Sequence, residues 1–187
     1  LPDGNAFELS LHVSAGRTLS VDAGQVIKRN LRDIGIKAIV ESEGNNLFVE
    51  KRNSGKHQVT IHLINNGMDP VSKPHHYFPV SQGYQSAPLT GKYVSSDGKM
   101  GVEPEGKLKE LLDIYNQASV ETDPEKRNNL VREAMKIHTE QLFQIGVIGY
   151  AGFPIVIHNR MKNVPEELIN AYQNAPTFRP EQYYIQE

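Results

Sequence analysis

The stretch HQVTIHLINNGMDP, residues 57–70, joins the features of a buried strand to those of a turn. Residues 57–63 are dense in β-branched and apolar side chains, which is typical of a largely buried strand. The two asparagines and the glycine of residues 65–67 tolerate positive φ, and Asp69-Pro70 favours an extended or turn conformation. We therefore predict a strand over residues 57–63 that leaves the sheet through a polar turn.

This turn is the first place to look for a binding site. Ligands of open α/β sheets bind outside the carboxyl ends of the strands, where a turn presents side chains and backbone amides. An ordinary surface loop explains the same residues about equally well.

Strand and helix signals alternate ahead of the turn. Period-two patterns predict strands over residues 8–13 and 37–40, and helical spacing predicts a helix over residues 21–34 between them. A second, short helix is predicted to be capped by Asn45 or Asn46. Strands and helices joined by short links predict right-handed crossovers and an α/β fold, a mainly parallel sheet with flanking helices.

The second half of the chain has a weaker pattern. Residues 71–104 lose periodicity and predict a long irregular loop, whose tyrosines either stack on a ligand or hold the loop to its domain. Two helices follow, one with its apolar stripe in residues 108–115 and one with Asp123 as its N-cap. Residues 144–158 predict an interrupted strand. Residues 159–187 form a tail that opens with a short helix.

Composition limits the function classes. A chain of 187 residues is most simply one domain. The net charge of -2 gives no strong field toward nucleic acid or an anionic membrane. The absence of cysteine excludes disulfides, thiolate catalysis and cysteine-ligated zinc. Because the sequence begins at Leu1 without a methionine or a signal peptide, we expect a piece of a longer protein.

An enzymatic alternative rests on four residues. His62, His75, His76 and Asp69 form the set that a small α/β hydrolase or a metal-dependent enzyme would use. However, adjacent side chains diverge in an extended chain, and neither a zinc-binding His-Glu-x-x-His nor a Gly-x-Ser-x-Gly nucleophile elbow is present. We therefore predict a protein that is not an enzyme and has no cofactor. A third alternative, an interaction module, would need no ligand.

The order of the motifs resembles the C-terminal lobe of family 5 extracellular solute-binding proteins, the peptide and nickel receptors of ABC importers. The first half carries LPDG before a strand, then NLRDIGIKAIV, a short helix and a third strand that ends near a DP turn. The second half carries SSDGKMGVEPEGKLKELLDIYNQASVETDPEKRNNLVREAMKIHTE, VIHNRMKNVPEE and RPEQYYI. Each motif is weak alone, but their order is specific and spans essentially the whole chain.

The resemblance implies a receptor of two α/β lobes joined by a hinge, with the solute enclosed between them. Residues 1–187 would be one lobe of this periplasmic-binding-protein-like fold, and residues 159–187 a tail that packs toward the other. The receptor would be periplasmic or a cell-surface lipoprotein, attached to the membrane only through an anchor outside this chain. Its partners would be ABC permease subunits and a small polar solute, not nucleic acid.

The resemblance also points to the turn. Peptide-binding members have an aromatic residue and an aspartate there, and the aspartate holds the peptide amino group. Leu63 stands where the tryptophan is usual and Asn66 stands near the aspartate. A neutral amide cannot supply the charge-assisted bond that a buried ammonium requires, so a sugar, an uncharged peptide group or another polar solute remains. The predicted ligand-binding residues, which would face the cleft between the lobes, are Asn65, Asn66, Gly67, Asp69 and Tyr93.

Overall fold

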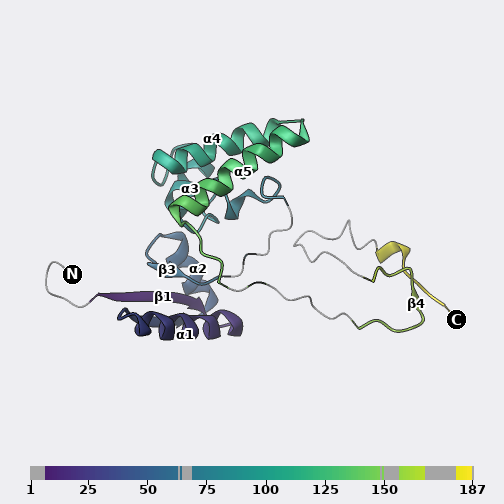
Figure 1. The fold of residues 1–187 in the computed structure, drawn as a ribbon, viewed down its shortest axis with the longest axis horizontal. Helices are drawn as coiled ribbons and strands as arrows, with labels where there is room; N and C mark the ends of the chain where they lie inside the picture. The colour runs from purple at the N-terminus through teal and green to yellow at the C-terminus, as the bar shows by residue number, and fades with distance from the viewer. Residues whose placement is uncertain are drawn as a thin grey trace.

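The computed structural model describes residues 7–62, 64, 69–147, 149, 156–166 and 180–186. Its elements follow one another along the chain as shown in Figure 1. They are β1 (Glu8–Ser14), α1 (Thr18–Asp33), β2 (Lys37–Glu43), α2 (Asn45–Asn53), β3 (Val59–Thr60), the 3-10 turn η1 (Pro74–His76), α3 (Pro88–Ser95), α4 (Gly106–Val120), α5 (Pro124–Gln141), β4 (Met161–Lys162), the 3-10 turn η2 (Pro180–Gln182) and β5 (Tyr184–Ile185).

The first three strands form a parallel sheet in the order β2-β1-β3, which confirms the predicted α/β class. The strand predicted over residues 57–63 is shorter, because β3 pairs with β1 only at Val59 and Thr60. One further bond, from Ile61 N to His12 O at 3.0 Å, extends the contact. Within the described residues β1 is the central strand of this sheet and β3 lies at its edge.

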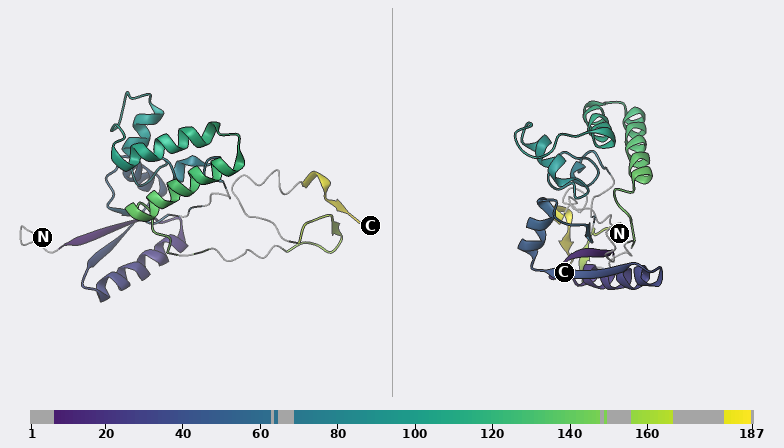
Figure 2. Two further views of the ribbon diagram at one scale, coloured as in Figure 1. Left: turned by 45° about the horizontal axis from the view of Figure 1, so that its top comes forward. Right: turned by 90° about the vertical axis from the view of Figure 1, so that its left-hand side faces the viewer.

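Helices cover both faces of this sheet. α1 contacts β1 and β2 on the face where Leu11 and Val13 are buried. Gly24 of α1 permits this close approach, because a Cβ there would lie 3.2 Å from Cγ1 of Val40. α2 contacts β1 and buries Phe48, which is 2% exposed. Figure 2 shows α1 and α2 on different sides of the sheet.

Two helix starts differ from the sequence-based expectation. α1 begins at Thr18, three residues earlier than the helix predicted over residues 21–34. The N-cap of α2 is Gly44 without a side-chain hydrogen bond, so the prediction of Asn45 or Asn46 as the cap is wrong. Asp123 is confirmed as the N-cap of α5, where its side chain accepts from the backbone N–H groups of Glu125 and Lys126.

A second hydrophobic core lies under α4 and α5, which pack against each other. Its buried members are Phe78, Tyr84, Leu111, Ile114, Ala134 and Ile137. Two of them, Phe78 and Tyr84, come from the stretch predicted to be an irregular loop, and both are 0% exposed. That stretch also forms η1 and α3, so the prediction of a long irregular loop over residues 71–104 is wrong in part.

The C-terminal part differs most from the expectation. Residues 144–147 and 156–158 form no strand, and residues 163–166 form no helix; residues 148 and 150–155 lie outside the description. Instead, β4 pairs with β5 in an antiparallel two-stranded sheet. This pair lies well away from α1 to α5 in both Figure 1 and Figure 2. Among the described helices, none is long and apolar enough to span a membrane.

Candidate functional site

Only two of the five predicted ligand-binding residues are described. Asn65, Asn66 and Gly67 lie outside the described residues, whereas Asp69 and Tyr93 lie within them. The placement of the turn toward a ligand therefore stays a prediction.

Asp69 holds the segment after β3 against α5. Its Oδ1 accepts from the Val71 N–H at 3.0 Å, and its Oδ2 accepts from Nη2 of Arg127 at 2.8 Å and from the Ser72 hydroxyl. Burial alone would raise the pKa of this carboxyl, but the hydrogen bonds from Ser72, Arg127 and Val71 outweigh it and lower the pKa. The carboxylate is thus ionised and fixed by the fold at neutral pH.

Tyr93 lies in α3 rather than in an irregular loop, and it is half-buried. A Cβ on Gly98 would lie 3.3 Å from its hydroxyl, so the ring lies against this glycine. Two other tyrosines hold the loop to its domain. Tyr77 and Tyr84 both make edge contacts with the ring of His138, whose Nε2 lies 2.7 Å from Tyr77 O.

The histidines of the enzymatic alternative lie closer together than expected. The His75 and His76 ring centroids are 4.2 Å apart, because η1 is not extended and the expected divergence does not apply. The ring centroid of His62 lies 6.5 Å from that of His76, and the His62 ring also stacks on Phe48. Burial, followed by the neighbouring His75 and His62, lowers the pKa of His76 to about 4. Burial likewise lowers the pKa of His75, so His75 and His76 are neutral at pH 7.

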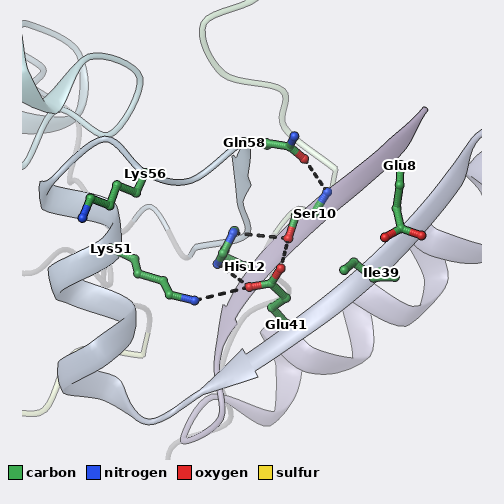
Figure 3. A pocket seen from close by; sticks show the side chains of 8 residues that line it. All are labelled: Glu8, Ser10, His12, Ile39, Glu41, Lys51, Lys56 and Gln58. Atoms are coloured by element: carbon green, nitrogen blue, oxygen red, sulfur yellow. Dashed lines mark hydrogen bonds and ion pairs between the residues drawn. The ribbon is translucent and has the colours of Figure 1, made fainter. Parts of the chain in front are cut away.

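A recess of about 460 Å³ opens on the sheet face that α2 covers, and the sequence patterns did not predict it. Figure 3 shows charged and polar side chains from β1, β2, α2 and the segment before β3 converging on it. Its lining residues are Glu8, Ser10, His12, Ile39, Glu41, Lys51, Lys56 and Gln58. In the sequence, Ser10 and His12 alternate with apolar residues, which predicts that they lie on the solvent-facing side of a half-buried strand. However, His12 is only 5% exposed.

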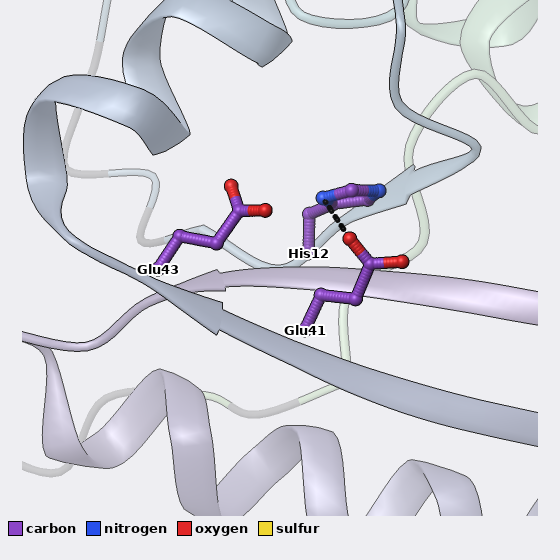
Figure 4. Close-up of side chains that lie close together, drawn as sticks. All are labelled: His12, Glu41 and Glu43. Carbon is purple, nitrogen blue, oxygen red and sulfur yellow. Dashed lines mark ion pairs between the residues drawn. The ribbon is translucent and has the colours of Figure 1, made fainter.

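The parallel register brings the groups of this recess together. His12 pairs with Glu41 across β1 and β2, and Glu43 follows two residues later on the same face. The His12 Nδ1 atom lies 3.4 Å from Oε2 of Glu41, as drawn in Figure 4. The Ser10 hydroxyl donates to Oε1 of Glu41, which is the main cause that lowers the pKa of Glu41. Lys51 of α2 forms ion pairs with both Glu41 and Glu43.

Within the described part of the chain, this recess holds the group best suited to bind a metal. One donor atom each of His12, Glu41 and Glu43 lies within 4.8 Å of the others. The histidines at positions 62, 75 and 76 form no such group among the described residues.

Solved structures resemble this chain, although no family model and no curated protein matches it. The oligopeptide-binding protein OppA is 27% identical with a TM-score of 0.75, covering 100% of this chain and 32% of its own. NikA from Brucella suis, in complex with Fe(III)-EDTA, is 17% identical with a TM-score of 0.56, covering 74% of this chain and 25% of its own. The periplasmic binding protein MelB from Agrobacterium fabrum C58, in complex with stachyose, is 17% identical with a TM-score of 0.58. The match covers 75% of this chain and 22% of the MelB chain.

The similarity to OppA extends over the full chain at 27% identity. NikA and MelB, both at 17% identity, support the fold alone. The chain spans about a third of the OppA chain, 32% of its length. The resemblance inferred from the motif order is thus confirmed: this chain has the fold of one lobe of a family 5 extracellular solute-binding protein.

Proposed function

We propose that this chain is the C-terminal lobe of an extracytoplasmic solute-binding protein that serves an ABC importer. It captures a peptide, an oligosaccharide or a similar polar solute between two lobes and delivers it to the permease. The observation that carries this proposal is the match to OppA over 100% of the chain at a TM-score of 0.75. The parallel sheet supports it, because the polar turn follows β3 in the sequence and ligands of such sheets bind outside the carboxyl ends of the strands.

The solute class follows from the relatives and from the turn. OppA is an oligopeptide-binding protein, and the MelB structure contains stachyose. Both kinds of solute present hydroxyl or amide groups, which the side-chain amides of Asn65 and Asn66 can pair with as donors and acceptors. The proposed ligand contacts are therefore Asn65, Asn66, Gly67, Asp69 and Tyr93.

Binding is favoured over catalysis by the state of the alternative catalytic set. The Asp69 carboxylate is engaged by Arg127, Ser72 and the Val71 N–H, which leaves it a poor general base. His76 has its pKa lowered to about 4 and packs between other rings. The solute-binding neighbours, among them the periplasmic MelB, support an extracytoplasmic location for the receptor. We also propose that a segment outside this chain anchors the receptor to the membrane. Residues 159–187 would pack toward the second lobe.

Mass spectrometry of the full-length receptor tests this function. The receptor is purified without added ligand and denatured, and the released small molecules are identified. The proposal predicts a bound peptide or oligosaccharide that is recovered intact after long incubation with the native protein. Conversion of that molecule to products, with loss of turnover in a His75→Gln/His76→Gln variant, would support the enzymatic alternative instead.

A further inference from the structure

Two buried acceptors in the recess have no hydrogen-bond donor among the described residues. They are Nδ1 of His12 and Oε2 of Glu43, each with almost no atomic exposure. The His12 side chain is only 6% exposed, so bulk solvent does not reach this atom. Unpaired buried polar atoms of this kind are rare, and each calls for an explanation.

The Ser10 hydroxyl determines which nitrogen of His12 carries the proton. Ser10 has one hydroxyl proton, which it donates to Oε1 of Glu41. Its oxygen also lies 3.3 Å from Nε2 of His12, so it acts there as the acceptor of an Nε2–H bond. Nδ1 then lies 3.4 Å from Oε2 of Glu41 without a hydrogen bond to it. A cation that both atoms coordinate would satisfy them.

We propose that His12, Glu41 and Glu43 form a binding site for a divalent first-row transition-metal ion such as Zn²⁺. One imidazole nitrogen and two carboxylate oxygens are ligands that such ions accept, with water in the remaining position. The 3.4 Å between His12 Nδ1 and Glu41 Oε2 is already close to a tetrahedral ligand separation, which is roughly 3.4 Å for bonds of about 2.1 Å. Glu43 needs only a side-chain shift, since its donor atom lies within 4.8 Å of the other two.

Neighbouring groups fix the orientation of His12 and Glu41, as hydrogen-bond partners do for the ligands of known metal sites. Ser10 bonds both Glu41 and Nε2 of His12, which orients the carboxylate and fixes the ring tautomer. His12 and Glu41 belong to paired strands, so their backbones cannot drift apart. The site shares no residue with the predicted solute-binding turn, and it does not depend on the proposed transport function.

Lys51 occupies the cation position when no metal is bound. Its Nζ contacts Glu41 at 3.4 Å and also Glu43, so the carboxylates already share a positive charge. The lysine lies on α2, at the recess wall, and its side chain is 33% exposed. Its long side chain can therefore swing into solvent when a divalent ion takes its place.

Calorimetric titration with Zn²⁺ tests the site in the full-length protein at pH 7. The proposal predicts a saturable site that Glu43→Gln weakens by about tenfold or more, as expected for loss of one ligand. His12→Gln should weaken Zn²⁺ binding by a similar factor, because it also removes one ligand. Lys51→Met should strengthen binding by about five- to tenfold, because it removes a competing charge. The matched control, His75→Gln/His76→Gln, keeps all three ligands and should leave the affinity unchanged.

Three results would overturn the proposal. They are the absence of saturable Zn²⁺ binding, binding that is lost in His75→Gln/His76→Gln but kept in Glu43→Gln, and an affinity that Lys51→Met leaves unchanged or lowers. Melting curves in EDTA show whether each variant is folded. Because Glu43→Gln is nearly isosteric, it decides the question if His12→Gln does not fold.

Discussion

Asp69 and Arg127 are 58 positions apart in sequence, yet Nη2 of Arg127 donates to Oδ2 of Asp69 at 2.8 Å. The bond ties the segment after β3 to the first turns of α5. It therefore links the sheet, which carries the predicted solute-binding turn, to the helical core beneath α4 and α5.

Replacing Asp69 with asparagine should lower the free energy of unfolding by about 0.5–1.5 kcal/mol, since the pair is partly exposed and screened by solvent. Urea unfolding at pH 7 measures the loss. The matched control is Asp113→Asn, which removes the more exposed pair with Lys109 and should cost only about 0.3–0.5 kcal/mol. Equal losses in the two variants would contradict a special role for Asp69.

The effect of Asp69→Asn on stability should depend on pH. The pKa of Asp69 is lower in the folded protein than in the unfolded chain, so its contribution is complete above the unfolded value, about 3.9. It is lost as the pH falls through the folded value. The difference in stability between the native protein and Asp69→Asn should therefore shrink in acid. A difference that grows below pH 4 would contradict this.

His76 should make the protein less stable in mild acid. Its pKa is about 4 when folded and about 6.5 when unfolded, so the unfolded state binds more protons between these values and stability falls as the pH drops through that window. His76→Gln should remove about 1–3 kcal/mol of this dependence, allowing for solvent screening. Urea unfolding at pH 7.5 and 4.5 measures it. The exposed His158, replaced by glutamine, should change the dependence little.

Gly91 is required by a close approach of two segments. A Cβ there would lie 1.8 Å from the backbone oxygen of Ser81, so Gly91→Ala must displace α3 from the loop before it. Although alanine usually stabilises a helix, this change should cost about 2 kcal/mol or more. Thermal unfolding is the measurement. Gly16→Ala is the control, because a Cβ there meets nothing within 4 Å. Comparable melting temperatures for both variants would contradict the packing.

These contacts show why the sequence predicted some elements and not others. β1 and β2 each run for seven residues with a clear period, and the sequence predicted both. β3 has two residues, both within the longer strand predicted over residues 57–63, whereas β4 and β5 have two residues each and no pattern that predicted them. α3 was missed because Gly91 interrupts its helical pattern, and that glycine is present for a contact with Ser81 that local sequence cannot reveal.

The recess was missed for a different reason. His12 and Glu41 are 29 positions apart, and only the register of β1 and β2 makes them neighbours. Their alternation suggested a solvent-facing side, but α2 folds back over that side and buries Phe48 and His12. His12 lies within the strand predicted over residues 8–13, whereas Glu41 lies one residue beyond the strand predicted over residues 37–40, so the pairing of the two could not be predicted from these strands.

The predicted turn can be tested at Asn66 in the full-length receptor. Asn66→Ala should leave polar groups of an enclosed solute unpaired and weaken binding by about 1–3 kcal/mol, roughly five- to hundredfold. The melting temperature without solute should barely change. A lower melting temperature with unchanged affinity would instead assign Asn66 to shaping the turn. Asn66→Asp, by gaining affinity for free dipeptides, would place the side chain at the peptide amino group.

The central claim is that this chain supplies one side of a two-lobe site, and calorimetry on two proteins tests it most directly. The solute recovered from the full-length receptor is titrated into that receptor and into the 187-residue chain, whose folding is checked by circular dichroism. Because enclosure provides much of the affinity of such a site, we predict that the chain alone binds at least about a hundredfold more weakly. Equal affinity for the two proteins would contradict the claim and place the whole site within this chain.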